Sequence, residues 1–181
     1  MRVVLREFKA ERRRRARRHA QEHRVSMHVL LRVAAWSMDA THLGRDEDRS
    51  AVQGEVICEV ASSRTIGLSA RPQATGEDVV RLLEATRIER SGRPLPFMSG
   101  NGIAYVSEAV AAWCKKSGVL LLRSLPRTPQ HNAASEHGVY GLKLNSGLDD
   151  GGAVVVCEDA LARLSSARTR IDNNSMRQSR G

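Results

Sequence analysis

Residues 94–143 constrain the fold more than any other part of this chain of 181 residues. Two short apolar runs, residues 95–98 and 119–122, are each followed by turn-forming residues and then by a segment with helical periodicity. Apolar runs of this length predict buried strands, and apolar positions three or four apart predict amphipathic helices. The stretch is therefore expected to form two strands that alternate with two helices, as in an α/β protein.

Local signals predict where these two helices begin and end. Ser107 is a favourable N-cap for the first helix, and Gly118 closes it because glycine readily adopts the left-handed conformation found after helix ends. Thr128 and Pro129 have the pattern of an N-cap and a first helical residue for the second helix. Four polar residues of that helix lie three or four positions apart and share roughly one face: Asn132, Glu136, Tyr140 and Lys143. Considered alone, such a face is as readily solvated surface as a functional site.

The rest of the chain supplies three more strands and two more helices. The strands are expected at three places: the second half of residues 29–38, residues 52–60 and residues 65–70. Asp39 ends the first strand, and the other two form an antiparallel hairpin. One helix is capped by Thr75 and ends near residue 91, and another covers residues 158–171. The predicted order is β-β-β-α-β-α-β-α, with one further helix near the C-terminus.

The charge of the chain is strongly positive and concentrated near its start. The formal net charge is +9 and the pI is about 10.4, which favours a polyanionic partner, most simply nucleic acid. Residues 1–24 hold ten Lys or Arg against three Glu. We expect this arm, as a helix or as a disordered tail, to contact phosphates without reading sequence; the alternative is a merely solvated arm. The residues expected to contact DNA are Arg12, Arg13, Arg14, Arg15, Arg17 and Arg18.

Composition also argues against several other classes of protein. Three widely spaced cysteines, without a C-x-x-C pair, predict buried thiols in a reducing cytoplasm rather than disulfides or a zinc site. No apolar run approaches the roughly 18 residues of a membrane span, and no secretory segment is visible. The expected location is therefore cytoplasmic and nucleoid-associated, with no membrane partner.

Two separated motifs resemble the catalytic core of the integrase and insertion-sequence transposase superfamily, named DDE after its three acids. The first is T-P-Q-H-N-x-x-x-E at residues 128–136, and the second is W-S-M-D-A-T-H-L at residues 36–43. The resemblance implies a ribonuclease-H-like α/β fold, which is a mixed five-stranded sheet with helices on both faces. It also implies three regions: a basic arm or linker helix at residues 1–32, an integrase-type catalytic core at residues 33–145, and a partly helical, truncated C-terminal extension at residues 146–181.

The resemblance further implies a chemistry and the residues that perform it. These proteins cleave and transfer DNA strands with two Mg²⁺ or Mn²⁺ ions, so Asp39 and Glu136 are expected to be catalytic and to bind metal. Lys143, Asn132 and His131 are expected to contact DNA. DNA is the implied partner, together with either a second copy of the chain or an intact transposase.

One position departs from the family pattern. The second acid of the family is the aspartate of a D-N-G triplet, whereas this sequence has Gly100-Asn101-Gly102. The alignment is secure because 35 residues separate position 100 from Glu136, the spacing of one subgroup of the family. Glycine has no side chain to coordinate an ion, so we expect metal occupancy and cleavage to be severely reduced or absent.

Three functions remain open from the sequence. The first is a transposase-type core for DNA integration that is impaired at Gly100. The second is a non-catalytic DNA-binding remnant or regulator, so whether the chain is an enzyme is left open. The third is a ribonuclease-H-like nuclease with another substrate, which the T-P-x-x-N helix disfavours.

Overall fold

The computed structural model describes residues 34–124, 132–148 and 156–178, and the isolated residues Glu11, Arg14, Arg15 and Val29. For residues 175–178 it describes the backbone alone. Within the basic arm, Arg15 forms an exposed ion pair with Glu11 at 3.1 Å. Several residues singled out from the sequence lie outside the described part of the chain: Arg12, Arg13, Arg17, Arg18, Thr128, Pro129 and His131.

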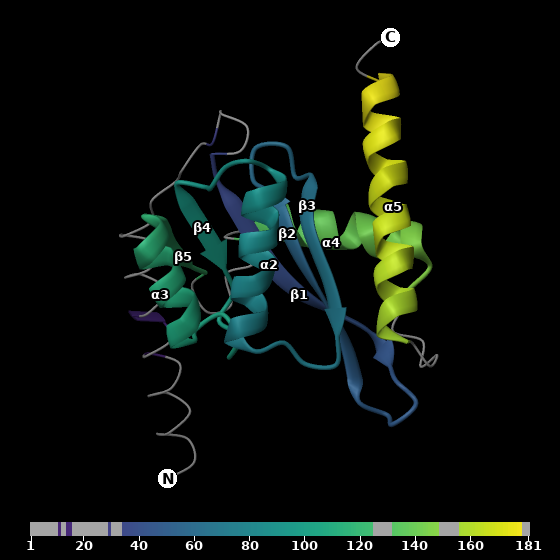
Figure 1. Cartoon of the computed structure of the whole chain (residues 1–181), viewed down its shortest axis with the longest axis horizontal. Coiled ribbons are helices and arrows are strands. Elements are labelled where there is room, and N and C mark those ends of the chain that lie inside the picture. The colour runs from purple at the N-terminus through teal and green to yellow at the C-terminus, as the bar shows by residue number, and fades with distance from the viewer. Residues whose placement is uncertain are drawn as a thin grey trace.

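A mixed sheet of five strands in the order β3-β2-β1-β4-β5 forms the centre of the molecule (Figure 1). The strands are β1 (Trp36–Arg45), β2 (Ala51–Glu59), β3 (Thr65–Arg71), β4 (Pro96–Ser99) and β5 (Leu120–Arg123). β1, β2 and β3 are antiparallel neighbours, whereas β4 and β5 run parallel to β1. The mixed five-stranded sheet expected from the sequence is therefore confirmed.

In the described part of the chain, four helices pack around this sheet: α2 (Gly76–Glu89), α3 (Glu108–Ser117), α4 (Ala133–Ser146) and α5 (Cys157–Gln178). In the view of Figure 1, α2 and α3 lie in front of the sheet, α4 lies behind it, and α5 stands beside β3. No helix among the described residues is both long enough and apolar enough to cross a membrane.

Side chains alternate along β1 and so divide the core into two parts. Trp36 and Met38 point to the side of α2 and α3, where they pack with Phe97, Leu83 and Trp113. The second apolar cluster lies on the side of α4 and α5 and includes Val56, Cys58, Leu142, Leu164 and Ala167. The sheet therefore separates two environments, and the candidate site faces the second.

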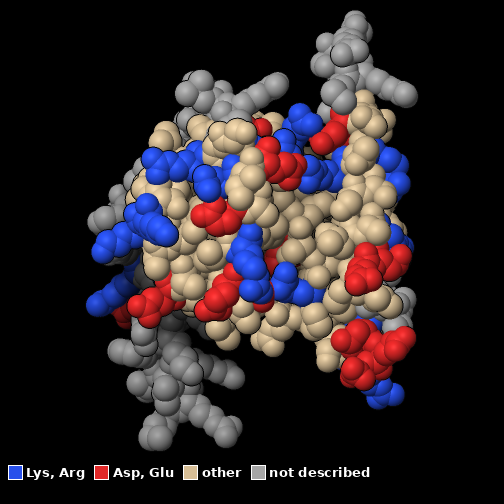
Figure 2. All heavy atoms as spheres, in the orientation of Figure 1, with Lys and Arg blue, Asp and Glu red and all other residues tan. Residues whose placement is uncertain are grey.

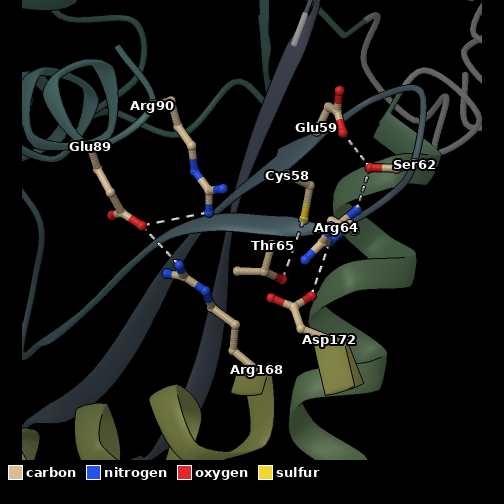
Figure 3. A network of polar contacts seen from close by, with 9 residues as sticks. All are labelled: Cys58, Glu59, Ser62, Arg64, Thr65, Glu89, Arg90, Arg168 and Asp172. Carbon is tan, nitrogen blue, oxygen red and sulfur yellow. Dashed lines mark hydrogen bonds and ion pairs between the residues drawn. The ribbon is translucent and has the colours of Figure 1, made fainter. Parts of the chain in front are cut away.

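α5 is fixed to the body of the molecule by ion pairs as well as by its apolar face (Figure 3). Arg64 Nε lies 3.0 Å from Asp172 Oδ1, which connects the β2–β3 turn to α5. Arg168 Nη2 lies 2.9 Å from Glu89 Oε1, and Arg90 approaches the same carboxylate at 3.6 Å. These contacts tie α5 to the end of α2 and to the hairpin, across a gap in sequence of about half the chain.

The predicted caps of the first two helices are confirmed. Thr75 and Asp78 form a reciprocal capping box at the start of α2. Ser107 accepts a hydrogen bond from the backbone of Val110 at the start of α3, and Gly118 ends that helix with φ of 64°.

Two predictions about strands are wrong. Asp39 does not end β1, because the strand continues to Arg45 through its pairing with β2 and only its neighbour β4 stops, at Ser99. The predicted buried strand at residues 119–122 is an edge strand instead, and Leu120 is 62% exposed. A short apolar run does not distinguish a central strand from an edge strand, since both need one buried face.

The end of one helix and the burial of one cysteine also differ from expectation. α4 begins at Ala133 after an N-cap at Asn132, and the helix start expected at Thr128 and Pro129 lies outside the described residues. α5 continues to Gln178 instead of ending near residue 171, because no glycine or proline interrupts the segment. Cys58 and Cys114 are buried as predicted, whereas Cys157 is only half-buried at the start of α5.

Candidate functional site

Parallel pairing of β1 and β4 places Asp39 beside position 100. Met38 lies opposite Ser99 in this ladder, so the next residue of each strand follows side by side. A Cβ atom added to Gly100 would lie 3.9 Å from Asp39 Oδ1, and within 4 Å it would meet no other described atom outside its chain neighbours. The structure thus has room at position 100 for a side chain directed at Asp39.

Two further hydrogen bonds fix the loop that carries position 100. Asn101 Nδ2 donates to the carbonyl oxygen of Ser124 at 2.7 Å. The backbone N–H of Ser124 donates in turn to the carbonyl oxygen of Ser99 at 2.9 Å. The end of β4 is therefore held to the end of β5, and the backbone at Gly100 keeps its place without a side chain of its own.

The first turn of α4 is attached to β1 by two polar contacts. Asn132 Nδ2 donates to the carbonyl oxygen of Met38 at 3.3 Å, and Ser135 Oγ donates to Ser37 Oγ at 2.7 Å. Ser135 is fully buried and Ser37 nearly so. These contacts bring the exposed Glu136, which follows Ser135, into electrostatic reach of Asp39.

The environment of Asp39 raises its pKa above the usual value for an aspartate. Burial is the main cause, and a hydrogen bond from the backbone N–H of Ala40 at 3.0 Å opposes it. The negative charge of Glu136 raises the pKa further, while a hydrogen bond from the Asn132 amide lowers it. Two carboxylates that repel each other in a half-buried place are an arrangement that a cation would stabilise.

The side chains present fit a divalent ion in kind but not in number. Carboxylates are the hard oxygen ligands that Mg²⁺ and Mn²⁺ prefer, and Asp39 and Glu136 provide two of them. Within the described part of the chain, no group of three or more His, Cys, Asp or Glu side chains could hold a metal ion. Position 100, where the family pattern has a further acid, is glycine, so a resident ion would depend on two acids and solvent.

Of the predicted contact residues near the acids, Lys143 and Asn132 are described; of those in the arm, Arg14 and Arg15 are described and exposed. Lys143 lies in the last turn of α4, seven residues after Glu136, and is half-buried. Asn132 is only 6% exposed and its amide is directed at Met38 and Asp39. Contact of Asn132 with DNA stays a prediction, but its burial favours a role in positioning Asp39.

Ser37 and Ser135 were not identified from the sequence. Both are short polar residues in apolar surroundings, where sequence patterns give little signal. Strand alternation offered the one available clue, because Ser37 lies between Trp36 and Met38 and must point to the opposite face. A polar residue on the inner side of a strand then requires a partner, which Ser135 supplies.

A second buried acid lies on the other face of the sheet. Glu55 on β2 is paired with Ala40 and is 2% exposed, and its carboxylate accepts a hydrogen bond from the hydroxyl of Tyr105. Burial is the main cause that raises the pKa of Glu55, the Tyr105 bond opposes it, and the charge of Asp39 adds to the rise. Tyr105 follows the loop of Gly100, so this contact also links that loop to β2.

Glu55→Gln is expected to make the protein more stable at neutral pH and less sensitive to pH. The pKa of Glu55 is higher in the folded than in the unfolded chain, so the folded chain binds the proton more tightly. The free energy of unfolding therefore falls as the pH rises from the pKa of Glu55 in the unfolded chain through its pKa in the folded chain. A neutral amide avoids this loss, and the gain should be on the order of 1 kcal/mol. Urea unfolding at mildly acidic and mildly alkaline pH measures it, and equal pH dependence in both proteins would contradict the prediction.

Asn132→Ala is expected to destabilise the protein by about 1 kcal/mol, since it removes the buried hydrogen bond from its amide to the carbonyl of Met38. Asn145→Ala is the matched control. Its amide donates to the carbonyl of Gly141 at 2.8 Å in the same helix but on an exposed surface, and should change stability by less than about 0.5 kcal/mol. Chemical denaturation compares the two, and equal effects would show that the buried contact contributes nothing specific.

Comparison with solved structures gives the class of the fold. A chain of the simian T-cell lymphotropic virus intasome in complex with PP2A regulatory subunit B56 gamma matches with a TM-score of 0.61 and 19% identity, over 77% of this chain and 50% of that chain. The BIV integrase catalytic core domain matches with a TM-score of 0.55 and 21% identity, over 75% and 81% of the two chains. The HTLV-2 integrase catalytic core domain in complex with magnesium, in a trimeric form, matches with a TM-score of 0.56 and 19% identity, over 76% and 85%.

These likenesses identify the ribonuclease-H-like fold of integrase cores, although the chain spans only half the length of the intasome chain. The family model described as "Integrase core domain" matches residues 32–129, which is more than half of the chain. The chain therefore belongs to the integrase core domain family, a family of DNA integration and recombination. No curated protein matches it.

Proposed function

We propose that this chain is a transposase-type core that binds DNA beside Asp39 and Glu136, and that its metal-dependent strand cleavage is severely weakened at Gly100. One observation carries the proposal. Asp39 and Glu136, far apart in the sequence, are electrostatically coupled, and the only described atom outside its chain neighbours that a Cβ at position 100 would approach is Asp39 Oδ1. These features support a site formed by Asp39, Glu136 and position 100, at which the last contributes no acid.

Asp39 and Glu136 are the residues that would hold Mg²⁺ or Mn²⁺. Such an ion, when bound, activates the attacking oxygen and stabilises the leaving oxygen in phosphodiester chemistry. The chain itself orients the ligands: the Ala40 N–H and the Asn132 amide fix the Asp39 carboxylate, and the contact of Ser135 with Ser37 fixes the turn that carries Glu136.

Loss of one acid weakens this arrangement for a simple reason. Mg²⁺ exchanges its water reluctantly and is bound through a few well-placed carboxylates. With glycine at position 100, the residue that follows β4 contributes no anionic oxygen beside Asp39. We expect a lower affinity for the metal ion and a less precise alignment of the reacting groups.

Phosphate contacts are assigned to basic residues near this site and in the arm. Lys143 follows Glu136 by two helical turns, so its ammonium could approach a phosphate bound beside the acids. The arm would add contacts that do not depend on sequence, through Arg12, Arg13, Arg14, Arg15, Arg17 and Arg18. A second copy of the chain or an intact transposase would complete the assembly.

A second candidate function is a non-catalytic DNA-binding remnant or regulator. Gly100 is the observation that favours it, because a chain without cleavage activity but with an intact fold and positive charge still binds DNA. It would then occupy DNA ends or pair with an active transposase.

A strand-cleavage assay with Mg²⁺ or Mn²⁺ tests the proposal, combined with measurement of duplex binding at increasing salt. We expect little or no cleavage and an affinity that falls steeply with salt, because phosphate contacts release counterions. Efficient cleavage that disappears in Asp39→Asn would contradict the impairment while supporting the site. Binding that is insensitive to salt would contradict DNA as the partner.

A further inference from the structure

A group of basic side chains lies where α2 and α3 end, apart from the acids of the candidate site. In the orientation of Figure 2, Lys and Arg side chains gather at the upper left, over the upper ends of these two helices. We call four residues the basic patch: Arg87 in the last turn of α2, Lys115 and Lys116 in the last turn of α3, and Arg93 in the loop between α2 and β4. Arg93, Lys115 and Lys116 are exposed.

Glu84 pairs with one of these four residues and lies within electrostatic reach of a second. Arg87 Nε lies 2.6 Å from Glu84 Oε2, and the charge of Lys116 helps to lower the pKa of Glu84. A Cβ added to Gly118 would lie 3.0 Å from Arg93 Nη1, which places that guanidinium over the end of α3. Residues from two helices and one loop therefore share one surface.

The charge of this surface is largely uncompensated. Glu84 already accepts hydrogen bonds from Arg87 and, at 2.9 Å, from the indole N–H of Trp113. Among the described residues, Arg93, Lys115 and Lys116 form no ion pair. Basic residues often stabilise the C-terminal end of a helix, and Arg93 can do so as well, since its guanidinium lies over the end of α3. The side chains of Arg93, Lys115 and Lys116 are nevertheless exposed and so remain accessible to a phosphate.

The basic patch and the candidate site lie on opposite faces of the sheet. α2 and α3 pack against the face of Trp36 and Met38, whereas Ser135 of α4 contacts Ser37 on the other face. A straight duplex that contacts Asp39 and Glu136 cannot at the same time lie along the ends of α2 and α3. The two surfaces therefore suit two separate segments of nucleic acid.

We propose that the basic patch binds the phosphate backbone of a second segment of double-stranded DNA, separate from the segment at Asp39 and Glu136. Exposed Lys and Arg side chains bind the phosphates of DNA without reading its sequence. The inference relies on the proposed function only in taking DNA as the partner, because the proposed function places DNA at α4 and the arm alone.

The test compares two double variants of the full chain with equal loss of charge. Lys115→Gln with Lys116→Gln removes two cations from the basic patch. Arg45→Gln with Arg49→Gln removes two exposed cations from the β1–β2 turn and is the control. The slope of log affinity against log salt for duplex DNA should become shallower by about two in the patch variant, at about 0.9 per lost phosphate contact. The control should keep the slope of the unmodified chain.

A bridging assay tests the second segment directly. The unmodified chain bound to an immobilised duplex should retain a second, labelled duplex; the patch variant should lose it and the control should keep it. Equal effects in both variants would overturn the proposal in favour of diffuse charge. An unchanged slope with altered sedimentation would also overturn it, since the patch would then hold protein, such as the acidic turn at residues 46–48 of a second copy.

The two proposals can fail separately. Gly100→Asp, alone or combined with Asp39→Asn, alters the candidate site and leaves the basic patch intact. If the patch variant changes the salt slope while Gly100→Asp responds to Mn²⁺ no differently with or without Asp39→Asn, only the proposed function fails. If Gly100→Asp gains a response to Mn²⁺ that Asp39→Asn removes, and the patch variant has no effect, only the present inference fails.

Discussion

Gly100→Asp is expected to increase metal-dependent strand cleavage by at least about 100-fold. The added carboxylate would start from a Cβ 3.9 Å from Asp39 Oδ1, in space that the fold leaves open. A correctly placed ligand set contributes several kcal/mol to phosphodiester chemistry, and about 1.4 kcal/mol corresponds to a tenfold change in rate. Cleavage of a labelled DNA substrate, with Mg²⁺ or Mn²⁺ and with chelator, measures the gain.

The same substitution predicts a thermal signature that does not depend on cleavage. Without metal, a third carboxylate beside Asp39 and Glu136 adds repulsion, so the melting temperature should fall. With Mn²⁺ it should rise above that of the unmodified chain, because an ion that binds only the folded state stabilises it. Gly100→Asn has the same size and no charge, and should show neither effect.

Two outcomes would contradict this prediction. The first is a Gly100→Asp protein that is folded but whose melting temperature does not respond to Mn²⁺. The second is equal activity in Gly100→Asp and in the same protein with Asp39→Asn added. Either result would mean that position 100 does not belong to a metal-binding group with Asp39.

Gly138→Ala is expected to destabilise the protein by about 1–3 kcal/mol, although alanine is the better helix former. A Cβ at this position would lie 2.3 Å from Cys58 Sγ, with Thr65 Oγ1 and the carbonyl of Ser63 only 3.6 Å away. Cys58 is fully buried on β2, so α4 would have to move away from the sheet. Such a shift would also move Glu136, two residues earlier.

Two comparisons isolate the cause of this effect. Gly141→Ala lies one turn further along α4, where the nearest atom to an added Cβ is Ile171 Cδ1 at 3.8 Å, and it should stabilise by about 0.5–1 kcal/mol. Cys58→Ala removes the sulfur that the Cβ would meet, so Gly138→Ala should cost much less in that background. Urea unfolding of the four single and double variants measures the coupling, and additive effects would exclude the contact as the cause.

The architecture could be predicted from the sequence where local and tertiary signals agree. Thr75, Ser107 and Gly118 mark helix ends through side-chain and backbone preferences that act within a few residues, and all three do so in the structure. The order of strands and helices followed from apolar periodicity, together with the resemblance to integrase cores, and the mixed sheet agrees with it.

Three features that sequence reasoning missed depend on neighbours distant in the chain. The exposure of Leu120 depends on β5 having one neighbour only, and the length of β1 depends on β2. Likewise, the polar contact of Ser37 with Ser135 joins residues 98 positions apart. Hydrophobic pattern determines which residues avoid water, but it does not determine which strand lies at an edge or which hydroxyl finds a partner.

The hydrogen bonds around the loop after β4 have an evolutionary consequence. Asn101, Ser124 and Ser99 hold the backbone at position 100 through groups that the glycine does not contribute. A glycine codon and an aspartate codon can differ by a single base, so one mutation could exchange an acid for a hydrogen atom here, or reverse that exchange, without a change in architecture. Under the proposed function, a lineage carrying such a gene would keep an inactive core in which one substitution at position 100 restores the acid without any change of fold.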